Sequence, residues 1–176
     1  MVESNKQAAA DNQESTEEET EIQGADFFKT RFYRARVPEK DMVTMVEISE
    51  ITDMGANVRL LEYGAIEGFI QSNQVSRLRV RSVQRLLKVG RREMMEVLRV
   101  DEERMYIDLS KKSLMPDTMK EAEARWKKSK KVHEIMFEVA MKLKVPIEDL
   151  YEAWGWDMYE KCGLDHALDA MRVAMQ

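Results

Sequence analysis

The chain has 176 residues, of which 44% are hydrophobic and 35% are charged, a length that predicts one domain or two small ones. No stretch approaches the roughly 20 consecutive apolar residues of a membrane span, and no basic-then-apolar signal opens the chain, so we expect a cytoplasmic protein without membrane contact. The net charge of −5 is uneven, because residues 1–25 hold seven acids and one base, which sum to −6 and leave +1 for the rest.

The N-terminal segment, residues 1–30, is predicted to be a disordered acidic tail. Residues 1–25 contain almost no large apolar side chains. Such a segment cannot bury enough surface to offset the entropy that ordering would cost.

The region from 41 to 109 is predicted to form five short strands. We place them at residues 41–52, 56–62, 65–71, 94–100 and 105–109. In the second, Val58 and Leu60 alternate with polar neighbours, which is typical of a half-buried strand. The fourth is predicted to have one face that is formed by Met94, Glu96, Leu98 and Val100. Five strands over about 70 residues favour a five-stranded OB-fold barrel, which we place at residues 31–111.

Residues 72–92, between the third and fourth strands, contain seven bases and no acid. The bases are Arg77, Arg79, Arg81, Arg85, Lys88, Arg91 and Arg92. A row of arginines binds phosphates by releasing counterions, so this basic loop is the candidate RNA-facing surface, with a solvated basic loop as the alternative. Because aromatic side chains are few on the barrel, phosphate contacts with a structured RNA are favoured over base stacking. Val83, Leu86 and Leu87 fall at helical spacing and predict a helical turn within the loop.

Residues 112–176 are predicted to form a small helical domain. Pro116 suits a first helical turn, with Ser113 or Asp117 as candidate caps, and this long helix is expected to reach Lys144. Its apolar face is predicted to comprise Trp126, His133, Met136, Phe137, Ala140 and Leu143.

Two further helices are predicted after the long one. Pro146 opens the first of them, Gly163 ends it, and residues 164–175 form the second. The apolar face of the helix that Pro146 opens is predicted to be Leu150, Trp154 and Met158.

Catalytic and metal-binding patterns are missing from the sequence. It has no phosphate-binding glycine loop, no nucleophile elbow and no cluster of metal ligands. The single cysteine, Cys162, excludes an intrachain disulfide framework. We therefore expect a protein that is not an enzyme and that has no catalytic residue, metal or cofactor.

Ser76 opens the basic loop and is a candidate regulatory site. A phosphoryl group adds about −1.5 to −2 charge at neutral pH. Placed on Ser76, it could pair with the arginines that follow and reorganise the loop.

Four blocks of sequence, in their order and spacing, resemble one known family. They read MGANVRLLEY at 54–63, IEGFI at 66–70, VSRLRVRS at 75–82 and YIDLSKK at 106–112. Together they resemble the alpha subunit of eukaryotic translation initiation factor 2, in a divergent form, from about residue 32 to the end. The resemblance implies an OB-fold barrel followed by a helical domain. It also implies a role in the GTP-dependent complex that delivers initiator methionyl-tRNA to the small ribosomal subunit.

The same resemblance implies regulatory residues. Ser76 would be the position that stress-activated protein kinases phosphorylate, after which the subunit binds the guanine-nucleotide exchange factor unproductively and inhibits it. The strand formed by Met105, Tyr106, Ile107 and Asp108 would be the surface on which such kinases dock.

The implied partners are the other subunits of initiation factor 2, initiator tRNA, the small ribosomal subunit, the kinases and the exchange factor. The family has a third, α/β domain that holds the other subunits, and nothing after Met175 supplies it, so we expect a shortened chain. Two alternatives stay open. One is a stand-alone decoy that occupies the kinases, and the other is a generic OB-type RNA-binding module.

Overall fold

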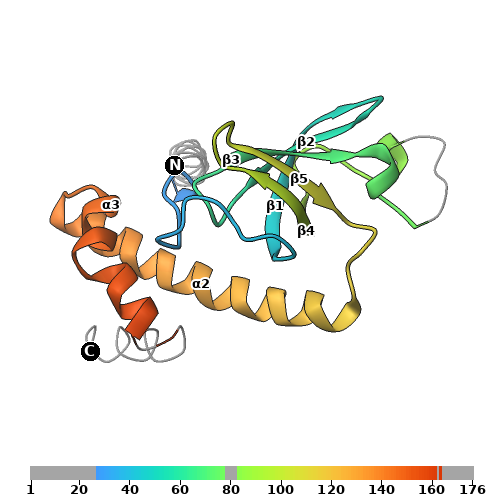
Figure 1. The fold of residues 1–176 in the computed structure, drawn as a ribbon. Helices are drawn as coiled ribbons and strands as arrows, with labels where there is room; N and C mark the ends of the chain where they lie inside the picture. Colours follow the sequence, from blue (N-terminus) through green and yellow to red (C-terminus); the bar gives the residue numbers. More distant parts are fainter. Residues whose placement is uncertain (1–26, 78–82, 162, 164–176) are drawn as a thin grey trace, which may run out of the picture.

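A five-stranded closed barrel and a long helix dominate the computed structural model of the chain, which describes residues 27–77, 83–161 and 163 (Figure 1). The strands are β1 (Val43–Thr52), β2 (Gly55–Leu60), β3 (Ile66–Gln71), β4 (Arg92–Asp101) and β5 (Tyr106–Ser110). The helices are α2 (Pro116–Leu143) and α3 (Ile147–Leu150), and short turns η1 (Ser72–Gln74), η2 (Val83–Arg85) and η3 (Tyr151–Gly155) complete the elements. No helix among the described residues has the length and apolar character needed to cross a membrane.

The barrel confirms the predicted OB-type fold. Its strands join in the order β1-β2-β3-β5-β4, with β3 and β5 parallel and every other pair antiparallel. All five predicted strands are present, with bounds shifted by at most two residues. β1 and β4 are long enough to pair with two neighbours each, and each carries an irregularity that lets the strand bend around the barrel.

The predicted face of the fourth strand is wrong, and a bulge explains why. Met95 and Val97 point into the barrel core, whereas Met94 packs outside it, in the cluster that contains Trp126 of α2. The pairing of β4 with β5 slips by one residue between Val97 and Arg99. Because a one-residue slip exchanges the two faces of a strand, Val100 returns to the core side.

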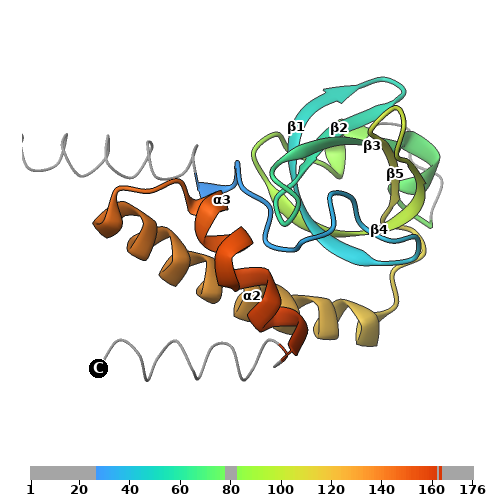
Figure 2. The same ribbon diagram turned by 60° about the vertical axis from the view of Figure 1, so that its left-hand side comes forward.

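α2 runs along the outside of the barrel, where it contacts β1 and β4, and its other end contacts α3 (Figure 2). The predicted helix is confirmed, with Pro116 in its first turn and Lys144 as a left-handed C-cap. The predicted caps are wrong, because the N-cap is Met115 and no side chain caps the helix. On the predicted apolar face, Leu143 is also wrong, since it is 60% exposed.

The second predicted helix begins as expected after Pro146, but its buried face differs. Turn η3 is a π-helical turn, which inserts one residue into the helical repeat and rotates the residues that follow. Tyr151 and Trp156 are therefore the buried aromatics, whereas Trp154 is 38% exposed. The third predicted helix, at 164–175, lies outside the described residues, as does Cys162.

Residues 27–36 form an ordered strap that fills the joint between the barrel and α2 (Figure 2). Most of the predicted acidic tail, residues 1–26, lies outside the described residues. Its predicted end at residue 30 is too late, because Phe28 and Thr30 are buried. Phe32, fully buried, stacks on His133 with ring centroids 4.2 Å apart and on Trp126 at 5.7 Å. The strap is thus part of the core.

A buried carboxylate ties the strap to the barrel and to α2. Glu62, 1% exposed, accepts hydrogen bonds from the Tyr33 hydroxyl at 2.7 Å, the Thr44 hydroxyl at 3.2 Å and the Met45 backbone N–H at 3.1 Å. The Tyr33 oxygen also lies 2.8 Å from the Ser129 hydroxyl of α2, which can donate to it. One carboxylate therefore orients groups from three parts of the chain.

His133 fixes the start of the strap in the same joint. It is fully buried, with its Nε2 2.6 Å from the Phe27 carbonyl and its Nδ1 2.7 Å from the Tyr151 hydroxyl. A neutral ring satisfies both contacts, with Nε2–H donating and Nδ1 accepting. Burial lowers the pKa of His133 from 6.5 to about 4.

We expect Glu62→Gln to lower the free energy of unfolding by about 2 kcal/mol, because the amide nitrogen that replaces one oxygen cannot accept a hydrogen bond. Denaturant unfolding followed by circular dichroism measures this. Glu67→Gln is the matched control, since Glu67 is exposed on β3. Equal losses in the two variants would contradict a structural role for the Glu62 network.

We expect stability to fall as the pH drops from 6.5 toward 4. The folded protein binds a proton on His133 less readily than the unfolded chain does, so the contribution of the neutral ring is complete above pH 6.5 and is lost toward pH 4. The loss amounts to roughly 3 kcal/mol. His133→Gln should remove this part of the pH dependence of the unfolding free energy, whereas His166→Gln should retain it.

Candidate nucleic-acid interface

The first residues of the basic loop are held against the end of β5. The carbonyl oxygen of Gln74 accepts from the backbone N–H groups of Lys111 and Lys112, both at 3.0 Å. The Gln74 side-chain oxygen accepts from the Ser110 hydroxyl at 3.1 Å. Val75 is buried in the barrel core, so Ser76 follows two anchored residues and is itself half-buried.

Arg77 is hydrogen-bonded to the connection between β5 and α2. Its Nε donates to the Lys112 carbonyl at 2.9 Å, and a terminal nitrogen donates to the Leu114 carbonyl at 3.3 Å. The side chain was predicted to face phosphate. In the structure its guanidinium joins the basic loop to the segment that begins α2.

The far end of the loop is anchored by apolar residues. Turn η2 confirms the predicted helical turn, with Val83 and Leu87 buried in the barrel core, although Leu86 is 38% exposed. Arg85 and Lys88 are exposed beside these anchors and are available to a polyanion. Arg79 and Arg81 lie outside the described residues.

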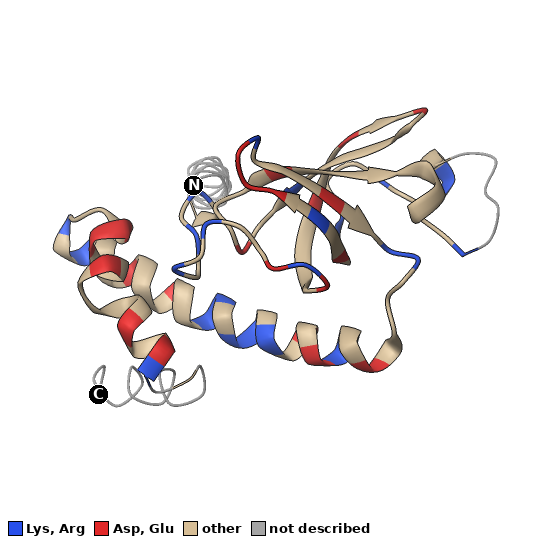
Figure 3. Cartoon of the chain, viewed as in Figure 1, with Lys and Arg blue, Asp and Glu red and all other residues tan. Residues whose placement is uncertain are grey.

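Two of the predicted RNA-facing bases are paired with acids of the barrel. Arg91 Nε lies 3.1 Å from Glu93, and Arg92 Nε lies 3.0 Å from Glu47. Lys111 also contacts Glu93, at 2.6 Å. Glu93 lies just beyond the acid-free segment and Glu47 lies on β1, so the loop carries less unpaired charge than its sequence indicates. Figure 3 shows acidic and basic residues close together on the strands of the barrel.

The predicted docking strand is only partly accessible. Ile107 is fully buried in the core, and Asp108 is half-buried opposite Phe69 of β3. Met105, with φ at 51°, and Tyr106 are 43% and 46% exposed. A partner that docks here could contact these two side chains but not Ile107. They border a recess of about 290 Å³ that Phe69 and Arg104 also line.

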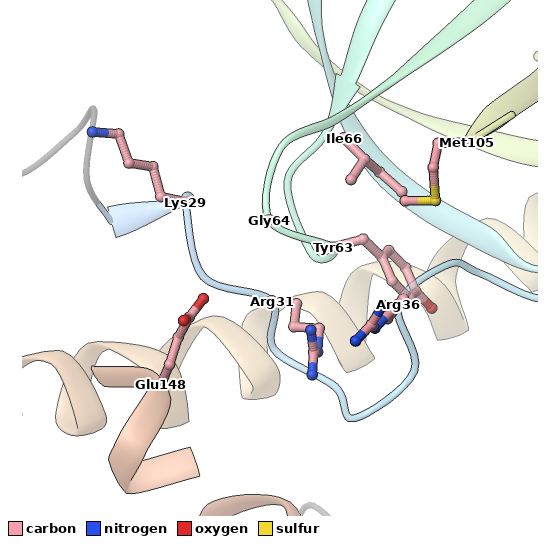
Figure 4. A pocket seen from close by; sticks show the side chains of 8 residues that line it. All are labelled: Lys29, Arg31, Arg36, Tyr63, Gly64, Ile66, Met105 and Glu148. Carbon is pink, nitrogen blue, oxygen red and sulfur yellow. The ribbon is translucent and has the colours of Figure 1, made fainter. Parts of the chain in front are cut away.

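A second recess, which the sequence analysis missed, lies between the strap and the barrel (Figure 4). Its volume is about 290 Å³. The residues that line it are Lys29, Arg31, Arg36, Tyr63, Gly64, Ile66, Met105 and Glu148. Residues 27–36 hold four bases and no acid, which is the signal that could have identified this surface. Because the tail was predicted to extend to residue 30, these four bases were assigned to two different segments and were not seen as one surface.

The described residues do not assemble a metal centre. In the part of the chain that the structure describes, no three His, Cys, Asp or Glu residues gather in an arrangement that could hold a metal ion. His133 is occupied by its two hydrogen bonds inside the joint.

Comparison with known proteins identifies similar chains. Residues 37–112 match the S1 RNA binding domain family. The eukaryotic translation initiation factor 2 subunit alpha homolog of Arabidopsis thaliana is 48% identical over 81% of this chain and 41% of its own length. Subunit 1 of the same factor from Plasmodium falciparum is 44% identical over 85% of this chain and 45% of its own length. The chain therefore spans less than half the length of these relatives.

Solved structures show the same likeness in three dimensions. The intact alpha subunit of aIF2 from Pyrococcus abyssi superposes with a TM-score of 0.71, 25% identity and coverage of 81% of this chain and 54% of that one. The a/eIF2alpha chain in a complex with aDim2p and rRNA from Pyrococcus horikoshii superposes with a TM-score of 0.60 and 25% identity, and covers 78% of this chain and 94% of that one.

The pKa of the Tyr106 hydroxyl is expected to depend on Asp108, which lies two residues along β5. Partial burial and the negative charge of Asp108 raise the pKa of Tyr106 above its usual 10. Asp108→Asn should therefore move that pKa back toward 10, which NMR titration of ring-labelled tyrosine can measure. Asp101→Asn is the control, and an equal shift in both variants would contradict a local effect of Asp108.

Proposed function

We propose that the chain is an alpha subunit of eukaryotic translation initiation factor 2, or the corresponding part of one, and that it acts in translation initiation. In this role it would join the GTP-dependent complex that delivers initiator methionyl-tRNA to the small ribosomal subunit. The observation that carries the proposal is the 41–48% identity to these subunits over about four fifths of the chain. The chain would work in the cytoplasm and would not itself be an enzyme.

We propose that RNA is contacted through the basic loop. The match to the S1 RNA binding domain and the closed barrel support an RNA-binding role. Arg85 and Lys88 are exposed next to the buried anchors Val83 and Leu87, so they can approach a phosphate backbone without disturbing the core.

We propose that phosphorylation of Ser76 regulates the subunit and makes it an inhibitor of the guanine-nucleotide exchange factor. Ser76 lies between two anchors, the hydrogen bonds of Gln74 and those of Arg77. A phosphate dianion on Ser76 would compete with the Lys112 and Leu114 carbonyls for the Arg77 guanidinium, because charge-assisted hydrogen bonds are about twice as strong as neutral ones. The modification would then loosen the link between the loop and the start of α2.

Kinase docking on the strand that follows Arg104 is part of the same proposal. The exposed side chains of Met105 and Tyr106 support it, since both stand beside a recess on the barrel surface. This surface lies at the start of β5, whereas Gln74, close to Ser76, is bonded to the residues that follow the end of β5, so a kinase could hold one site while it modifies the other.

The test is phosphorylation by a stress-activated kinase in vitro, with the modified residue mapped by mass spectrometry. We expect phosphate on Ser76 in the wild type and in the control Ser72→Ala, and none in Ser76→Ala. The phosphorylated chain should then bind the exchange factor more tightly than the unmodified chain. Kinase inhibition without phosphate transfer would support the decoy function instead. If the kinase neither transfers phosphate to the chain nor is inhibited by it, regulation at Ser76 is contradicted.

A further inference from the structure

An aromatic cavity of about 400 Å³ lies where the strap, α2 and the helical turns after η3 meet. Tyr33, Trp156 and Tyr159 form walls of it, and the exposed Ala35 stands among the lining residues. Its volume lies in the range of roughly 300–1,000 Å³ that is usual for pockets that hold small ligands or single groups of larger ones. The predicted RNA-facing and docking residues do not line this cavity.

Two N–H donors on residues that line this cavity lack acceptors, and the Tyr159 hydroxyl is also buried without a hydrogen-bond partner. Trp156 is 5% exposed, and its indole Nε1 is buried without a hydrogen-bond partner. Arg125 donates from a terminal nitrogen to the Val43 carbonyl, but its Nε is buried without a partner. A buried donor left unsatisfied costs about 1–3 kcal/mol. The pair therefore favours an occupant with acceptor atoms on the edge of a flat apolar body.

Positive charge lies next to the cavity on the strap. The Arg31 guanidinium stacks over the ring of Trp156 at 4.5 Å and, with Arg36, lines the basic recess (Figure 4). Arg34, between them in the chain, is neutralised by Asp157 and Glu160. Within the described residues, neither Arg31 nor Arg36 forms an ion pair, so both remain available to an anion.

We propose that this joint binds one unstacked nucleotide of a single-stranded RNA. The base enters the aromatic cavity with its acceptor edge toward Trp156 Nε1 and Arg125 Nε, and the phosphate is held by Arg31 and Arg36. The inference rests on the RNA-binding part of the proposed function but uses residues outside the basic loop. Stacking of a base on aromatic side chains contributes about 1–3 kcal/mol, and the phosphate adds the electrostatic part.

A nucleotide fits these observations better than an acidic peptide does. A carboxylate could pair with Arg31 and Arg36, but a short acidic side chain would not fill the space that the aromatic rings of Tyr33, Trp156 and Tyr159 border. A pyrimidine base carries carbonyl acceptors on a planar ring that can stack on aromatic walls. Charge and shape are therefore satisfied together only by a base that is joined to a phosphate.

The test uses the full chain and oligouridylate that contains one 4-thiouridine, with photo-crosslinks mapped by mass spectrometry. Ala35→Phe should fill the cavity without removing any core side chain, which avoids the unfolding that Trp156→Ala would risk. Ala124→Phe is the control, because Ala124 is exposed on α2 and lines no recess described above. Thermal melts establish that both variants fold.

We expect crosslinks to Trp156 or Tyr159 in the wild type and in Ala124→Phe, and their loss in Ala35→Phe with about tenfold weaker binding. Crosslinks confined to residues 72–92, with unchanged binding by Ala35→Phe, would overturn this inference and leave the RNA-binding proposal standing. No binding of RNA by any variant would overturn both. Binding of uridine monophosphate but not of the oligonucleotide would assign the cavity to a free nucleotide and overturn the RNA assignment.

Discussion

The buried carboxylate of Glu62 is the constraint on which the joint between barrel and helix depends. A carboxylate that is 1% exposed must be hydrogen-bonded, because the free-energy cost of burying an unpaired charge exceeds the net stability of a domain. Its donors come from the strap, through Tyr33, and from β1, through Thr44 and Met45. Because Tyr33 also contacts Ser129, satisfying one charge sets the position of the strap, the barrel and α2 together.

This joint also shapes the surface around it. The hydroxyl of Tyr33 belongs to the Glu62 network, while its ring forms a wall of the aromatic cavity. His133 holds Phe27 and Tyr151 from the other side, so the strap is fixed at its start and again at Tyr33. A site built on such a joint is pre-formed, and a ligand that enters it meets side chains already held in place. Little ordering entropy would then oppose binding.

The barrel could be predicted from the sequence because alternation is local, whereas the joint could not. The alternation of Val58 and Leu60 is visible in neighbouring residues, and both are buried as expected. The bulge near Leu98 and the π-helical turn at Tyr151 shift the pattern by one residue, and neither has a local signature. The pairing of Arg92 with Glu47 joins residues 45 positions apart, so the charge of the basic loop was overestimated.

The basic loop and the strap are held by different contacts, so a change at one need not reach the other. The basic loop is tied by Gln74 and Arg77 to residues 110–114, so a charge placed at Ser76 acts on the connection that leads into α2. The strap is tied by Glu62 and His133, which share no hydrogen bond with that connection. Figure 1 shows them at different ends of the barrel. If RNA binds both surfaces as proposed, a modification of the loop would alter one contact and leave the other intact, and so would change the geometry of the bound RNA without releasing it.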